Sequence, residues 1–199
     1  MQKRFISAEE LLKDSFTLAE QIYTRGCRPD FIVGVWRGGT PTGIAVQEFL
    51  EFMGVQTDHS AIRASSYAGI DMQHHTVDVH GLDYIVDNIQ TKHELLIIDD
   101  VFDTGRSIRA ILDALTVRCG INMPATVKIA CPWYKPSRNI SNIQPDFYLH
   151  STDAWLVFPH ELQGLSLEEI AKGKGEHISA TVSRALAHKQ RHEIDLKST

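Results

Sequence analysis

Residues Leu95 to Ser107 read LLIIDDVFDTGRS, a run in which aliphatic side chains pass directly into acids and then into a polar turn. The first part, LLIID, has the continuous apolar pattern of a strand that is buried on both faces. Aliphatic residues then recur at helical spacing, at Ile108, Ile111, Leu112 and Leu115. The stretch is therefore predicted to join a buried strand to a helix through a loop at the carboxyl end of the strand.

Further strands and helices alternate on both sides of this stretch. Short apolar runs predict strands at 31–36, 55–62, 125–132, 145–150 and 154–159. Helices are predicted up to about Gly26, between the turn RGGTPTG and Gly54, and twice after residue 166. Residues 65–80 are polar and weakly periodic, which indicates a long mobile connection. This order predicts an α/β fold with a mostly parallel sheet flanked by helices.

The first two helices should each bury one apolar face. The first is expected to bury Leu12, Ala19, Ile22 and Tyr23. The second is expected to bury Ile44, Ala45, Phe49 and Leu50.

Composition narrows the class of protein. A chain of 199 residues is the size of one domain with a substantial core, and its net charge of −5 gives no reason to expect a nucleic-acid partner. No apolar run approaches the length of a membrane span, so no membrane partner is expected either. The three cysteines, Cys27, Cys119 and Cys131, lack metal-ligand spacing and indicate reduced thiols in the cytoplasm.

The quoted stretch combines acids with a phosphate-binding pattern. Ligands of parallel sheets bind beyond the carboxyl ends of the strands, where Asp99 and Asp100 stand. The loop 103–107 offers hydroxyls, a glycine and the free N–H groups of a helix start, which together suit a phosphate. Carboxylates beside a phosphate would repel it unless they bind hydroxyls and a divalent cation. A sugar phosphate satisfies both halves of the pattern.

The same residues resemble the phosphoribosyl-pyrophosphate (PRPP) signature of type I phosphoribosyltransferases, and most closely the 6-oxopurine branch of that family. The likeness runs from about Phe31 to Glu161. It implies a phosphoribosyltransferase domain with a small base-binding hood over residues 1–165. Residues 166–199 would be a C-terminal helical extension of the same domain.

The resemblance implies a role for each part of the PRPP site. Asp99 and Asp100 would hold the ribose hydroxyls and Mg²⁺, and Asp103 would handle the proton of the base near N7 as the catalytic residue. The 5′-phosphate would lie on the loop Asp103, Thr104, Gly105, Arg106 and Ser107. The pyrophosphate would lie on Trp36, Arg37, Gly38 and Gly39, with a cis peptide bond between Trp36 and Arg37.

The resemblance also implies a base site and a lid. Lys135 would donate to the 6-oxo group of a purine, which a 6-amino group could not accept. Trp155 would stack on the purine ring and the backbone of Leu156 would meet its edge, with backbone carbonyls between Leu156 and His160 reading C2. Glu161 would help to hold a second metal ion. A flexible lid over the site would begin at Ser65, Ser66 and Tyr67.

The implied activity is purine salvage. PRPP and hypoxanthine, guanine or xanthine would give the nucleoside monophosphate and pyrophosphate in a Mg²⁺-dependent reaction, catalysed by a homodimer or homotetramer. Two alternatives stay open. One is a regulator on the same fold that binds PRPP or a nucleotide without catalysis, and the other is transfer to adenine or a pyrimidine.

Overall fold

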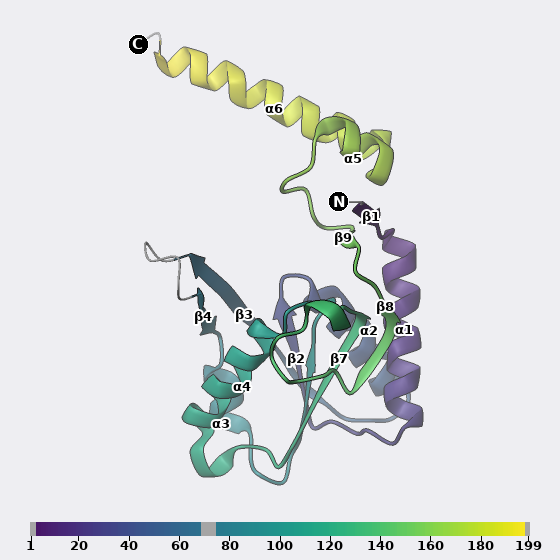
Figure 1. Cartoon of the computed structure of the whole chain (residues 1–199), viewed down its shortest axis with the longest axis vertical. Helices are drawn as coiled ribbons and strands as arrows, with labels where there is room; N and C mark the ends of the chain where they lie inside the picture. The colour runs from purple at the N-terminus through teal and green to yellow at the C-terminus, as the bar shows by residue number, and fades with distance from the viewer. Residues whose placement is uncertain (1–2, 69–74, 198–199) are drawn as a thin grey trace. The chain divides into compact units, whose positions relative to one another are not determined.

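The computed structural model describes residues 3–68 and 75–197 (Figure 1). Two compact units make up the chain: one runs from Glu9 to Asp153, and the other combines the residues up to Ala8 with the segment from Ala154 onwards. Each unit is described by itself below. In the described part of the chain, no helix is both long and apolar enough to cross a membrane.

The larger unit is built on a seven-stranded sheet. Its strands are β2 (Phe31–Trp36), β3 (Asp58–Ala68), β4 (His75–His80), β5 (Glu94–Ile98), β6 (Val101–Phe102), β7 (Thr126–Tyr134) and β8 (Phe147–Ser151). They follow the order β4-β3-β2-β5-β7, and both β6 and β8 pair with β7. Every pairing is parallel except β3 with β4.

Helices cover both faces of this sheet because its central strands alternate between two apolar cores. The helices are α1 (Ala8–Thr24), α2 (Gly39–Phe52), α3 (Asp83–Asn88) and α4 (Arg106–Cys119), with short 3-10 turns at Gly120–Asn122 and Pro136–Arg138. On one face Val33 and Ile97 pack with Ile111 of α4. On the other face Ile32 and Leu96 pack with residues of α1 and α2. The predicted α/β fold with a mostly parallel sheet is thus confirmed.

The buried faces of α1 and α2 differ from the prediction at one residue each. Leu12 is 52% exposed and Ile44 is 59% exposed. In α1 the buried face runs through Leu11, Ser15, Leu18 and Ile22. Ser15 is tolerated there because its hydroxyl donates to the Leu11 carbonyl at 2.7 Å, so the polar group is satisfied within the helix. Leu12 lies one position round the helix and faces outward.

The mobile connection predicted for residues 65–80 is wrong over most of its length. Residues 65–68 continue β3, and residues 75–80 form β4, which pairs antiparallel with β3 from Arg63↔His80 to Ala68↔His75. The residues between these strands, 69–74, lie outside the described part. Polar strand residues are possible here because β4 is an edge strand of the sheet. Strand β3 also starts at Asp58, three residues later than predicted.

The smaller unit holds two parallel strands and two helices. Strand β1 (Lys3–Phe5) pairs with β9 (Trp155–Val157), and α5 (Leu167–Lys174) and α6 (Glu176–Lys197) follow. Sequence analysis predicted β9 and both helices but not the three-residue β1. The predicted boundary near residue 165 stays a prediction, because by its contacts β9 groups with the C-terminal helices.

Candidate active site

The carboxyl ends of the parallel strands bring most of the predicted site residues of the larger unit to one edge of the sheet. Strands β2, β5 and β7 are neighbours in parallel register, so the segments that follow them emerge side by side. These segments are the glycine-rich loop 37–39, the stretch 99–107 and Lys135. The pyrophosphate, ribose, phosphate and oxopurine groups were predicted to meet these segments.

The loop before α4 forms a small cradle. Gly105 occupies the N-cap position of α4 with φ of 77°, a left-handed conformation that glycine adopts without strain. Because Gly105 has no side chain, the start of α4 is left open to a ligand. A cavity of about 70 Å³ lies here, lined by Asp99, Val101, Phe102, Asp103, Thr104, Gly105, Ser107 and Ile108. Arg106 lines a different and larger cavity of about 480 Å³ with Arg109 and Asp113.

A second loop supports the cradle from outside. The Ile140 N–H donates to the Thr104 carbonyl at 3.1 Å. A Cβ on Gly105 would collide with the Ser141 side chain and lie 2.8 Å from Cε1 of Phe102. Ser141 is itself held, because its hydroxyl donates to Oδ1 of Asn139 at 2.8 Å and its carbonyl accepts from Arg109 at 2.7 Å. The phosphate loop therefore has little room to change its shape.

The glycine-rich loop lies directly against the acidic pair. A Cβ on Gly38 would overlap the Asp100 carboxylate, and a Cβ on Gly39 would lie 2.7 Å from Cα of Asp99. Glycine is needed at both positions for this close approach. The Trp36-Arg37 peptide bond is cis, as the family resemblance implied. The predicted pyrophosphate loop and the predicted ribose and metal ligands are thus brought together.

The acidic pair is short of positive charge. Burial raises the pKa of the Asp99 carboxyl well above its usual range, and the neighbouring Asp100 carboxylate raises that pKa further. Among the residues that the structure describes, no three or more His, Cys, Asp or Glu side chains gather as a metal-binding group. Mg²⁺ is commonly bound by one or two carboxylates, with water and substrate phosphates as its other ligands. Asp99 and Asp100 fit a Mg²⁺ ion completed in that way.

Asp103 is held by two cations. Nζ of Lys135 lies 3.1 Å from Oδ2 of Asp103, and Nε of Arg138 lies 2.7 Å from Oδ1. Lys135 is only 4% exposed, so its ammonium group depends on Asp103 for compensation. Strand pairing sets this geometry, because the Lys135 N–H donates to the Phe102 carbonyl at 2.9 Å, next to Asp103. Sequence analysis missed Arg138; its only signal was an arginine three residues after the predicted base-binding lysine.

The remaining predicted residues lie elsewhere. Trp155, Leu156 and Glu161 belong to the smaller unit, where Trp155 is half exposed and Leu156 is buried in β9. The three predicted lid residues lie in β3, where Ser65 pairs with Asp78, Ser66 with Val77 and Tyr67 with Thr76.

Comparisons with known proteins agree with this geometry. The family model "Phosphoribosyl transferase domain" matches residues 2–165. The hypoxanthine-guanine phosphoribosyltransferase of Lactococcus lactis is 29% identical over 150 residues, covering 74% of this chain and 75% of that protein. The purine phosphoribosyltransferase of Pyrococcus horikoshii is 26% identical with a TM-score of 0.65, covering 83% of this chain and 99% of that chain.

A second solved structure supports the fold alone. The xanthine-guanine-hypoxanthine phosphoribosyltransferase of Helicobacter pylori matches with 22% identity and a TM-score of 0.62, over 86% of this chain and 99% of that chain. An α/β sheet that carries a phosphate cradle beside paired carboxylates defines a class of proteins that bind sugar phosphates. Within that class, this chain belongs to the phosphoribosyltransferase domain family. The relatives named here are purine phosphoribosyltransferases, so the branch implied by the resemblance is confirmed.

Proposed function

We propose that this protein transfers the 5-phosphoribosyl group of PRPP to N9 of a 6-oxopurine and releases pyrophosphate. One observation carries the proposal: the phosphate cradle at Thr104 to Ser107 adjoins a buried lysine that is paired with the acid of the same loop. The cradle suits the 5′-phosphate of a ribose. Lys135 suits a 6-oxo group, because an ammonium group only donates hydrogen bonds.

The chemistry follows from the placing of these groups. The bond from C1′ of the ribose to the pyrophosphate oxygen breaks, and a bond from C1′ to N9 of the base forms, through an oxocarbenium-like state. The base loses one proton, and Asp103 is placed to accept it at N7. Asp99 and Asp100 hold the ribose hydroxyls and Mg²⁺, with Glu161 as a further metal ligand. Bound Mg²⁺ supplies positive charge to the departing pyrophosphate.

The acceptor step requires a change of partners. Lys135 must leave Asp103 to reach the base, and Asp103 must then keep a cation beside it. Arg138 meets that need, since it contacts the other carboxylate oxygen. Both groups of this pair are partly exposed, so the pair adds at most about 1 kcal/mol to the free energy of unfolding.

We expect Arg138→Gln to lower kcat about tenfold, equivalent to ~1.4 kcal/mol of transition-state stabilisation. The melting temperature should change little, and Arg138→Lys should recover part of the activity because it restores the charge. Steady-state kinetics and thermal unfolding of both variants check this expectation. Arg118→Gln is the matched control, since Arg118 forms a 2.6 Å ion pair with Asp83 outside the proposed site. An unchanged kcat in Arg138→Gln would remove Arg138 from the mechanism.

The activity itself is tested by pyrophosphate release. The protein is incubated with PRPP, Mg²⁺ and, in separate reactions, hypoxanthine, guanine, xanthine, adenine and uracil. We expect release with one or more of the three 6-oxopurines and none when Mg²⁺ is chelated with EDTA. Release with adenine or uracil alone would reassign the acceptor. Binding of PRPP without release in any reaction would contradict the enzyme and favour the non-catalytic regulator.

A further inference from the structure

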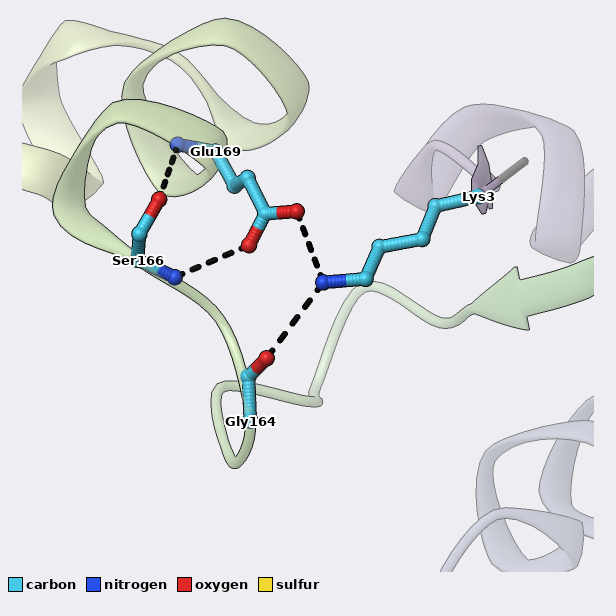
Figure 2. Close-up of polar contacts among 4 residues, drawn as sticks. All are labelled: Lys3, Gly164, Ser166 and Glu169. Carbon is cyan, nitrogen blue, oxygen red and sulfur yellow. Dashed lines mark hydrogen bonds and ion pairs between the residues drawn. The ribbon is translucent and has the colours of Figure 1, made fainter. Parts of the chain in front are cut away.

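The C-terminal helix α5 lies outside the residues matched by the family model, yet it is bonded to the strands of the smaller unit. Figure 2 shows Nζ of Lys3, in β1, donating to Oε1 of Glu169 at 2.7 Å and to the Gly164 carbonyl at 3.4 Å. The other oxygen of Glu169 accepts from the Ser166 N–H at 2.9 Å, and the Ser166 hydroxyl accepts from the Glu169 N–H at 3.1 Å. This capping box starts α5, and Lys3 ties it to β1.

Apolar packing fixes the same helix. A Cβ on Gly173 of α5 would collide with the ring of Phe5 in β1, so helix and strand are in close contact. Ile170, on the neighbouring turn of α5, is 2% exposed. Strand β1 in turn pairs with β9, which contains Trp155 and Leu156. The C-terminal extension therefore contributes a wall to the unit that holds the predicted base-binding strand.

Lys174, at the end of α5, reaches the turn that follows β9. Its Nζ donates to the Phe158 carbonyl at 2.6 Å and to the Pro159 carbonyl at 3.2 Å. The same turn is closed by Glu161, whose N–H donates to the Phe158 carbonyl at 3.0 Å and whose carboxylate accepts from the Phe158 N–H at 2.9 Å. Burial lowers the pKa of Lys174, and the nearby Glu161 carboxylate partly opposes that shift.

The position of this contact gives it a consequence for the base. The carbonyls of Phe158 and Pro159 belong to the short stretch after Trp155 that was predicted to face C2 of the purine. Two carbonyls aimed at one ammonium group cannot turn freely toward another donor. Lys174 therefore sets the direction of these carbonyls before any base arrives.

We propose that Lys174 is a positioning residue for base recognition: it holds the Phe158–Glu161 turn, and with it the strand that carries Trp155 and Leu156. The inference rests on the proposed function, because it assigns the smaller unit to the purine. It gives the C-terminal extension a role that the matched family region does not contain. Lys174 does not touch the base and takes no part in the bond changes.

The test uses the full-length protein with Lys174→Met, which keeps most of the aliphatic stem and removes the donors. We expect the KM for the base to rise about tenfold, because two buried carbonyls lose their donor. The KM for PRPP and kcat should stay near the wild-type values. Lys174→Arg should recover most of the affinity for the base. Lys172→Met, an exposed lysine on the same helix, is the matched control.

Hydrogen–deuterium exchange separates this inference from the proposed function. We expect faster exchange in peptides spanning residues 155–161 in Lys174→Met than in Lys172→Met, whether or not the protein is active. An active wild type whose base KM is unchanged in Lys174→Met overturns the inference and leaves the proposed function standing. Equal exchange in the two variants also overturns it. An inactive wild type with faster exchange in Lys174→Met contradicts the proposed function, while the contact of Lys174 with the turn is upheld.

Discussion

Asp103→Asn should lower kcat by roughly 10²- to 10⁴-fold, the usual contribution of a general base, while PRPP still binds. Asparagine keeps the shape of the side chain but cannot accept the proton of the base. The cradle keeps its glycine and both hydroxyls, so the 5′-phosphate retains its contacts. Turnover is measured by pyrophosphate release, and PRPP affinity by titration calorimetry in the absence of a base.

The same change should also destabilise the protein. Lys135 is buried and Asp103 is its ionic partner, so the variant leaves an uncompensated charge in the interior, at a cost of roughly 3–5 kcal/mol. Activity must therefore be compared at a temperature where the variant is fully folded. Asp113→Asn, an exposed carboxylate on α4, is the control. Turnover that stays at the wild-type level would exclude Asp103 as the base.

Gly105→Ala should abolish tight PRPP binding and lower the free energy of unfolding. A left-handed alanine costs roughly 1–2 kcal/mol. The added methyl group would also collide with Ser141 and press on the ring of Phe102, and overpacking of this kind costs roughly 1–3 kcal/mol more. Neither neighbour can yield easily, since Phe102 is buried and Ser141 is fixed by Asn139 and Arg109. Urea unfolding and PRPP titration measure the two effects.

Gly54→Ala is the matched control for that prediction. Gly54 has φ of 83°, close to that of Gly105, but a Cβ there would meet nothing within 4 Å. The control therefore carries the backbone strain without the collision. We expect it to lose stability by the smaller amount and to bind PRPP normally. Equal losses in the two variants would mean that the packing of Ser141 on the cradle is unimportant.

The sheet and its active edge could be predicted from the sequence because continuous aliphatic strands and a long motif carry non-local information in a local pattern. LLIID can only be a strand buried on both faces, and the acids that follow it must then lie at a carboxyl end. Proximity of the Gly38–Gly39 loop to Asp100 followed from parallel pairing of the two strands, although neither segment reveals it alone.

Other features could not be predicted because tertiary contacts decide them. Strand β1 has three residues and forms only because β9 pairs with it. The hairpin of β3 and β4 is polar, so its alternation is too weak to separate an edge strand from a loop. Arg138 and Lys174 show no pattern in the sequence, and their roles depend on carboxylate and carbonyl groups brought close by the fold. Ionic and hydrogen-bonding partners of this kind become visible only in three dimensions.

A crystal structure of the protein with a 6-oxopurine nucleoside monophosphate tests the central claim most directly. The proposal predicts the phosphate in the cavity between Thr104 and Ser107, with its oxygens at the start of α4. It also predicts that Nζ of Lys135 has moved from Asp103 to the 6-oxo group, while Arg138 still contacts Asp103. A phosphate bound at any other place, with this cavity blocked by its own side chains and the Lys135–Asp103 pair intact, would contradict the claim.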